Sequence, residues 1–348
     1  MTPDRKIGSA NGQPHLESVE PRFALPGGEV RLTGSHLRPP ELRQPRVAFA
    51  DTPGNVVISS DNFLVARVPE GAVSGGVTVA TDGATSNPQQ VGVAAPIAEN
   101  LHPVANPAID QEGNIYATFS GPRGQKVPVA IYKIDPADNV KPFVADMMNP
   151  TGLAVDIDGM LYASSRYDGT VYQVGPNGSY STYAEGMGVA TGIAFDHDRN
   201  LYVGDRSGTI FKIARDRQIY VFATLEPSIS AYHLAFGPNG SLFVAGPTTS
   251  SFDAVYEIDT HGSVSVFYRG LGRPQGLAFD DAGNMYVAAS LAGKRGIVRI
   301  TQERKASLAV SGHNLVGLAF APERSVVLAT TSALYHLAWD IAGRPLIP

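Results

Sequence analysis

Two segments decide the fold: residues 149–174 read NPTGLAVDIDGMLYASSRYDGTVYQV, and residues 189–213 read VATGIAFDHDRNLYVGDRSGTIFKI. Both carry Thr-Gly, an apolar run ending in Asp, a polar turn, Leu-Tyr, an arginine and then Gly-Thr before an apolar strand. Asp156 and Asp196, which end the two apolar runs, lie 40 positions apart. The sequence therefore contains a repeated unit of about 40 residues.

The same unit can be followed through the rest of the chain. Its apolar run ends at similar intervals, and a second strand containing an aromatic or large apolar residue follows each time. The six run ends are Asp110, Asp156, Asp196, Gly237, Asp280 and Ala321. Four-stranded units that recur at this period are typical of β-propellers. We predict that residues 102–348 form six blades.

The preceding part of the chain has a different pattern. Residues 15–93 contain about seven short alternating strands separated by Gly, Pro and Asn turns, which predicts a β-sandwich. In the strand Glu29–Thr33, Val30 and Leu32 point to one face and Arg31 to the other. Residues 1–14 are predicted to be a flexible lead and residues 94–101 a linker. The expected fold class is all-β, with a small sandwich followed by a propeller.

Composition restricts the classes of partner. The 348 residues carry a formal net charge of −5, and the chain contains no cysteine. The acidic balance predicts no nucleic-acid partner, and the absence of cysteine excludes disulfides and thiolate metal sites. The first residues lack the apolar core of a secretory signal, and no apolar run is long enough for a membrane helix. We therefore expect no membrane span and, by default, a cytoplasmic location.

Residues 15–93 resemble the immunoglobulin-like IPT/TIG domain over nearly their whole length. The resemblance rests on four motifs: Val19-Glu20-Pro21, the segment Gly27–Gly34, Val47-Ala48-Phe49, and Val68–Gly71 followed by Ser86-Asn87-Pro88. It implies a binding or spacer module without catalysis.

The repeats resemble NHL repeats and, more loosely, the six-bladed propellers of the gluconolactonase and senescence-marker superfamily. Leu201–Asp205 followed by Gly208–Phe211 is the best match to the NHL pattern. The resemblance implies a propeller fold. It also raises the alternative of a lactonase-type hydrolase with a lactone or sugar-acid substrate.

The predicted site lies on one face of the propeller. In an antiparallel meander, the start of each first strand and the end of each second strand share a face. Arginines at equivalent or nearby positions suggest a rim that binds an anionic or polyhydroxy ligand, or an acidic peptide. The candidate ligand-binding residues are Arg123, Asn149, Arg166, Asp168, Asp205, Arg206, Tyr232, His233, Gln275 and Arg295. A simpler reading pairs Arg166 with Asp168 and Arg206 with Asp205 as surface ion pairs.

Enzymatic activity is the alternative hypothesis. His233 replaces a glycine of the other repeats and is the one candidate acid–base group. The gluconolactonase resemblance implies a divalent cation, calcium or zinc, held by carboxylates and asparagines near the axis. The equivalent positions carry Ala108, Thr151, Thr191, Tyr232, Gln275 and Val316, none of them a carboxylate. We therefore expect no metal, no cofactor and a non-enzymatic binding or scaffold role.

Overall fold

The computed structural model describes residues 12–39, 43–249 and 253–344, and no residue in these ranges lies in a helix. Within these ranges there is accordingly no helix that could span a membrane. The chain divides into two compact units, one up to Ala94 and one from Ala95 onward. Most of the sequence predicted as a flexible lead lies outside the described residues.

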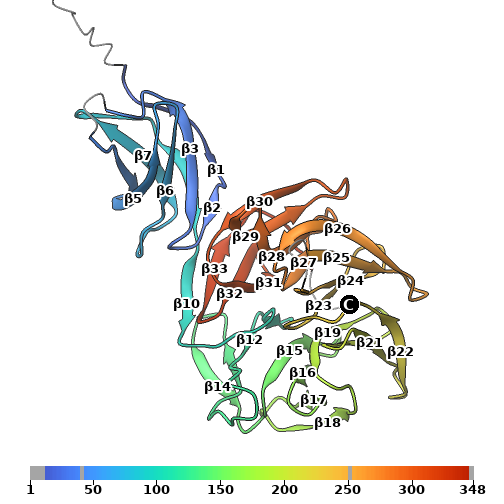
Figure 1. The fold of residues 1–348 in the computed structure, drawn as a ribbon. Coiled ribbons are helices and arrows are strands. Elements are labelled where there is room, and N and C mark those ends of the chain that lie inside the picture. The colour runs from blue at the N-terminus through green and yellow to red at the C-terminus, as the bar shows by residue number, and fades with distance from the viewer. Residues whose placement is uncertain (1–11, 40–42, 250–252, 345–348) are drawn as a thin grey trace, which may run out of the picture. The chain divides into compact units, whose positions relative to one another are not determined.

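Unit 1 is built from short strands that pair in two groups (Figure 1). Its strands are β1 (His15–Glu20), β2 (Phe23–Ala24), β3 (Glu29–Ser35), β4 (Arg46–Phe49), β5 (Thr52–Ser59), β6 (Phe63–Arg67), β7 (Gly75–Thr81), β8 (Ala84–Thr85) and β9 (Gln89–Val93). One group runs β1–β3–β6–β5 and the other β4–β7–β9, all antiparallel, with β2 parallel to β9 and β8 beside β7. Strand β5 also pairs with β4 and so joins the two groups.

The core of unit 1 follows the alternation that the sequence shows. Val30 and Leu32 of β3 are fully buried, whereas Arg31 between them is exposed. Both groups of strands contribute to a single apolar cluster, which includes Leu64 of β6 and Val77 and Val79 of β7. Burial of apolar side chains on one face of each strand is what holds the two groups together.

Unit 2 has a propeller-like arrangement of antiparallel sheets (Figure 1). Its strands are β10 (Ala95–Glu99), β11 (Ala108–Ile109), β12 (Ile115–Thr118), β13 (Ile131–Ile134), β14 (Val140–Val144), β15 (Pro150–Val155), β16 (Leu161–Ser165), β17 (Val171–Val174), β18 (Tyr180–Ala184), β19 (Ala190–Phe195), β20 (Leu201–Asp205), β21 (Thr209–Ile213), β22 (Ile219–Thr224), β23 (His233–Phe236), β24 (Leu242–Ala245), β25 (Asp253–Ile258), β26 (Val264–Gly272), β27 (Leu277–Phe279), β28 (Met285–Leu291), β29 (Lys294–Ile300), β30 (Ala306–Ser311), β31 (Leu315–Ala321), β32 (Ser325–Thr330) and β33 (Ala333–Ala338).

The strands of unit 2 pair mainly in the order of the sequence; the exceptions are β10 with β33 and a short pairing of β26 with β28. Four-stranded sheets are formed by β11–β14, by β15–β18 and by β19–β22, and strands β23–β26 and β27–β30 also pair in succession. The last three strands form a sheet with β10, which pairs with β33. The segment predicted as a linker therefore contains a strand that completes the final sheet.

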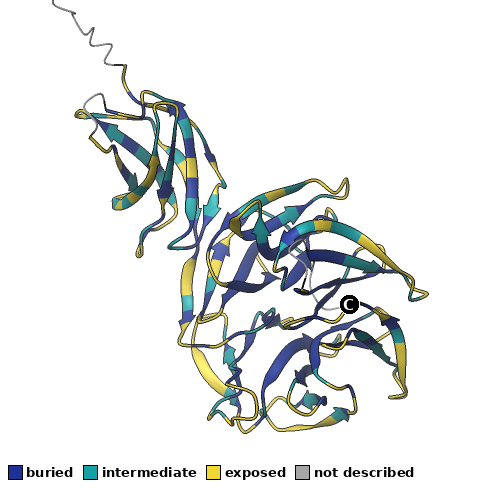
Figure 2. Cartoon of the chain, viewed as in Figure 1, coloured by how far each residue is buried: buried dark blue, intermediate teal, exposed yellow. Residues whose placement is uncertain are grey.

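The first strands of successive sheets contact one another. Strand β15 contacts β11 and β19, β23 contacts β19 and β27, and β31 contacts β27 and also β11. The succession therefore returns to its starting point. Figure 2 shows that these first strands are buried, whereas outer strands such as β14, β18 and β22 are partly exposed. Apolar clusters lie between neighbouring sheets, for example between the sheets that contain Tyr162 and Phe195.

The aspartates that mark the repeat stabilise turns. The Asp156 carboxylate accepts hydrogen bonds from the backbone N–H of Asp158 and Met160 and from the hydroxyl of Tyr162, over 3.0, 2.9 and 3.1 Å. Asp196 accepts from the Tyr202 hydroxyl in the same way, over 3.1 Å. The recurring aspartates are thus explained by hydrogen bonds within each repeat.

Candidate functional site

Three of the four predicted rim arginines lie near one another. Arg166 follows β16, Arg206 follows β20 and Arg123 lies in the loop between β12 and β13. Burial lowers the pKa of the Arg166 guanidinium, and the positive charges of Arg123 and Arg206 lower it further. This second effect requires Arg123 and Arg206 each to lie within electrostatic range of Arg166. We call Arg123, Arg166 and Arg206 the arginine cluster.

Arg166 is incompletely paired. Its Nη2 donates to the carbonyl oxygen of Gly121 over 2.9 Å, and its buried Nε has no partner among the described residues. A buried donor without an acceptor costs about 1–3 kcal/mol. The Nε of Arg206 donates to the carbonyl of Ser228 over 3.3 Å. In the described part of the chain, no carboxylate forms an ion pair with a cluster arginine.

The two predicted partner aspartates are occupied elsewhere. Asp168 accepts hydrogen bonds from the backbone N–H of Thr170, over 3.1 Å, and from the Tyr172 hydroxyl, over 2.7 Å. Burial and then this hydrogen bond raise the pKa of Tyr172 to about 12. Asp205 is buried and accepts from the backbone N–H of Val189 over 2.8 Å. The simple reading of Arg166–Asp168 and Arg206–Asp205 ion pairs is therefore wrong.

Asn149 fixes the loop that carries Arg123, one of the three cluster arginines. This buried residue has a positive φ of 43° and links two neighbouring sheets. Its Oδ1 accepts from the backbone N–H of Gly124 over 2.7 Å, and its Nδ2 donates to the carbonyls of Gly121 and Pro122 over 2.9 and 3.1 Å. Asn149 thus fixes the loop that carries Arg123, and both of its polar atoms are occupied by that loop.

The remaining predicted residues are dispersed. Arg295 is exposed on β29 and is not among the charges that shift Arg166. Tyr232 is buried, and its hydroxyl donates to the carbonyl of Glu226. Burial and nearby negative charge raise its pKa. Gln275 is partly buried, and its backbone N–H donates to Ala288 over 2.9 Å. These contacts assign Tyr232 to the packing between sheets.

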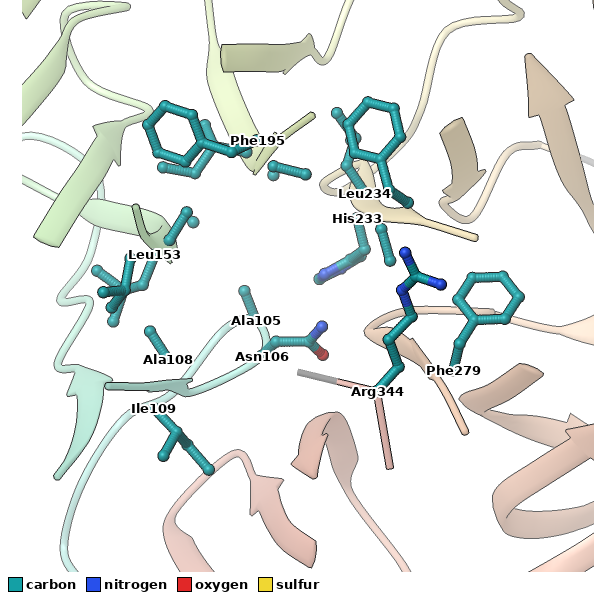
Figure 3. A pocket seen from close by; sticks show the side chains of 18 of the residues that line it. Ala105, Asn106, Ala108, Ile109, Leu153, Phe195, His233, Leu234, Phe279 and Arg344 are labelled. Atoms are coloured by element: carbon teal, nitrogen blue, oxygen red, sulfur yellow. The ribbon is translucent and has the colours of Figure 1, made fainter. Parts of the chain in front are cut away.

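His233 lies at the axis, inside a separate cavity of about 50 Å³. The cavity walls are formed mainly by the first strands, with Leu153, Phe195, Leu234 and Phe279 among the apolar residues (Figure 3). His233 is 3% exposed, and burial lowers its pKa to about 4. The imidazole is therefore neutral at physiological pH. It is the only predicted site residue among those that line the cavity.

The repeats carry equivalent positions four residues before each run end, and the first four of these positions line the cavity. The six residues are Asn106, Gly152, Gly192, His233, Gly276 and Gly317. The glycines allow close approach of neighbouring strands, since a Cβ added to Gly192 would lie 2.4 Å from the carbonyl oxygen of Tyr232. Figure 3 shows the side chains of Asn106 and His233 both directed into the cavity. Polar groups thus replace glycine at two of the six positions.

Asn106 and His233 differ in their contacts. The Asn106 amide donates to the carbonyl of Leu277 over 2.9 Å and accepts from the backbone N–H of Leu318 over 3.1 Å. It therefore ties the chain before β11 to β27 and β31. The His233 ring forms no hydrogen bond with another described residue, and its nitrogens are not among the buried polar atoms that lack a partner, so they face the cavity. Asn106 is not among the candidate ligand-binding residues that the sequence predicts.

Two basic side chains also line the cavity. His197 lies in the turn after β19, and Arg344 lies in the segment after β33. Arg344 is fixed by its backbone, whose N–H donates to the carbonyl of Phe279 over 2.8 Å. Its Nη2 lies 3.4 Å from Nε2 of His197. Neither residue was predicted, because the sequence gives no indication that residue 344 returns to the axis.

Comparison with known proteins identifies similar folds but no family. No protein-family profile and no curated protein matches the sequence. Similar solved structures include a protein of unknown function from Bacteroides thetaiotaomicron, with TM-score 0.59, 15% identity and coverage of 96% of this chain and 99% of that one. An auxiliary nutrient binding protein from the same organism has TM-score 0.56, 10% identity and coverage of 94% and 98%.

A gluconolactonase from Xanthomonas campestris is also similar, with TM-score 0.55, 12% identity and coverage of 70% of this chain and 88% of that one. At these identities the similarity establishes the propeller-like fold and leaves the activity to be argued from the site. The similar structures include both a binding protein and an enzyme, so fold similarity alone does not separate these two functions.

Proposed function

We propose that this protein is a non-enzymatic binding protein that holds an anionic ligand against the arginine cluster. The observation that supports this role is the charge of the cluster. Arg123 and Arg206 both act on the half-buried Arg166, whose Nε is unpartnered, and no described carboxylate forms an ion pair with any of the three. A carboxylate or phosphate would relieve the repulsion and accept from the free donors.

The loop geometry supports the same proposal. Asn149 fixes the segment from Gly121 to Gly124 through three hydrogen bonds, so Arg123 is carried by a preorganised loop. The exposed ring of Tyr167 lies beside Gly124, where an added Cβ would be 3.5 Å from the ring. A ligand on the cluster would therefore meet guanidinium groups and an aromatic edge, which suits a phosphate, a di- or tricarboxylate or an acidic peptide.

Calorimetric titration of the full chain with inorganic phosphate and with citrate at low ionic strength tests this proposal. We expect binding that weakens with added salt, and at least a roughly tenfold loss of affinity in Arg206→Gln and in Arg123→Gln. Both side chains are exposed, so their replacement leaves the core intact. Arg46→Gln, an exposed site on β4 with the same loss of charge, is the matched control. Equal affinities in all four proteins would contradict the proposal.

We also propose the finer assignments of fold. The succession of contacts between first strands returns from β31 to β11, which supports six blades. The pairing of β10 with β33 supports closure of the ring by a strand from the opposite end of the unit. The two strand groups around one core in unit 1 support an immunoglobulin-like sandwich of the IPT/TIG type. We assign that unit a spacer or binding role without catalysis.

A lactonase-type hydrolase is the second candidate, and the buried His233 favours it. A neutral imidazole can accept a proton, and the lowered pKa of about 4 makes this one a weaker base than an ordinary histidine. The divalent cation of such an enzyme does not fit this chain, however. No aspartate or glutamate lines the axial cavity, and no cluster of three metal-ligating side chains occurs among the residues described. Turnover of a panel of lactones by the purified protein, lost in His233→Gln, would reverse the ranking of the two functions.

A further inference from the structure

The axial cavity has the features of a second ligand site. It lies within unit 2 and shares none of its lining residues with the arginine cluster. Its walls are largely apolar, and the side chains of His233 and Arg344 both enter it (Figure 3). His197, next to Arg344, also lines it. We propose that this cavity binds a small monocarboxylate, with the carboxylate on Arg344 and a short apolar chain directed inward.

The charge of the lining selects the ligand. The residues around the cavity include one arginine and two histidines but no aspartate or glutamate. No described carboxylate forms an ion pair with Arg344, whose Nη2 contacts only the ring nitrogen of His197. A guanidinium at the mouth of an apolar cavity attracts a carboxylate and repels an ammonium group.

The walls and the volume limit the rest of the ligand. Leu153, Phe195, Leu234 and Phe279 present carbon atoms, which favour an alkyl chain over a polyhydroxy chain. The cavity of about 50 Å³ holds on the order of two to four water molecules, so a long acyl chain would not fit. Removing such water from apolar walls contributes to binding of an apolar group.

His233 gives the cavity one donor and one acceptor. Because its pKa is lowered to about 4, the ring adds no positive charge there at neutral pH. An ordered water or a polar atom of the ligand would satisfy the ring, which no described side chain does. The acid group is thus directed to the only permanent cation of the lining, Arg344, rather than to His233.

Saturation-transfer NMR on the full chain with propionate tests this proposal, with propionamide and propylammonium as probes of equal size. We expect a dissociation constant on the order of millimolar for propionate, weaker binding of propionamide, and none of propylammonium. Hexanoate should bind less well than butyrate because of the cavity volume. Equal binding of the acid and the amide would overturn the proposal.

Variants separate this site from the arginine cluster. Arg344→Gln should weaken propionate binding about tenfold or more, since a hydrogen bond to a charged group is lost. Arg199→Gln is the matched control, because Arg199 lies in the same turn as His197 but does not line the cavity. Arg206→Gln should weaken phosphate binding and leave propionate binding unchanged. Propionate binding that is unaffected by Arg344→Gln, or reduced equally by all three changes, would refute the site.

Discussion

Acidification should destabilise unit 2 through His233. Burial lowers the pKa of this side chain from 6.5 to about 4 in the folded protein. Between these two values the unfolded chain binds a proton that the folded chain does not. The free energy of unfolding therefore falls as the pH drops through this window. For one such group, the loss between pH 7 and pH 5 is about 2 kcal/mol, and it approaches about 3 kcal/mol below pH 4.

Urea unfolding at pH 7, 6 and 5, followed by tryptophan fluorescence, measures this effect. The chain has a single tryptophan, Trp339, which is buried in unit 2 and packs against Tyr286 and Phe320. The signal therefore reports on the unit that contains His233. In His233→Gln the titrating group is absent, so the variant should lose about 2 kcal/mol less than the wild type between pH 7 and pH 5.

The comparison with the variant is essential because other groups also titrate. Asp135, whose pKa is lowered to about 2, mainly by hydrogen bonds from Asn139, contributes equally in both proteins. Equal losses of stability in wild type and His233→Gln would refute the reasoning. So would an NMR titration of the His233 ring with a midpoint near 6.5, since the folded-state pKa would then be unshifted.

Two further predictions concern the repeat, both measured by the same urea unfolding at pH 7. Asp280→Ala should lower the free energy of unfolding by about 2–4 kcal/mol, because this buried carboxylate accepts two hydrogen bonds from Asn284 and one from a tyrosine hydroxyl. Asp259→Ala, in an exposed turn, should lower the free energy of unfolding much less, and similar losses for the two variants would contradict this account. Gly192→Ala should lower the free energy of unfolding by about 1–3 kcal/mol, because the new Cβ would lie 2.4 Å from the carbonyl oxygen of Tyr232. An unchanged urea midpoint would contradict this prediction, because the neighbouring strands would then move apart at no cost.

The repeat could be predicted from the sequence because the residues that mark it form hydrogen bonds with residues close by in the chain. Asp156 and Asp196 each bind a tyrosine hydroxyl six residues later, so their spacing to Leu-Tyr is fixed by one turn. Strand β10 was not predicted, since its partner β33 lies more than 200 residues further along the chain. A strand completed by such a distant partner leaves no pattern near itself, and the segment looked like a linker.

The arginine cluster was predictable only in part. The rule that strand starts and strand ends share a face predicts Arg123 and Arg206 on the same face as Arg166, and both lower the pKa of Arg166. It could not show that Asn149 and Asp205 use their polar atoms inside the protein. Sequence position determines the face on which a residue lies, whereas its partners depend on loop conformations that have no regular period.

The axial residues show what a fuller comparison of the repeats could have found. At the position four residues before each run end, glycine is required where neighbouring first strands approach closely, as at Gly192. A side chain at that position must therefore enter the axis or separate the strands. Asn106 and His233 both enter it, and only Asn106 is used to hold strands together. The ring nitrogens of His233 are not among the buried polar atoms that lack a partner, so they face the cavity and are left to the water or the ligand that occupies it, not to the packing of the strands.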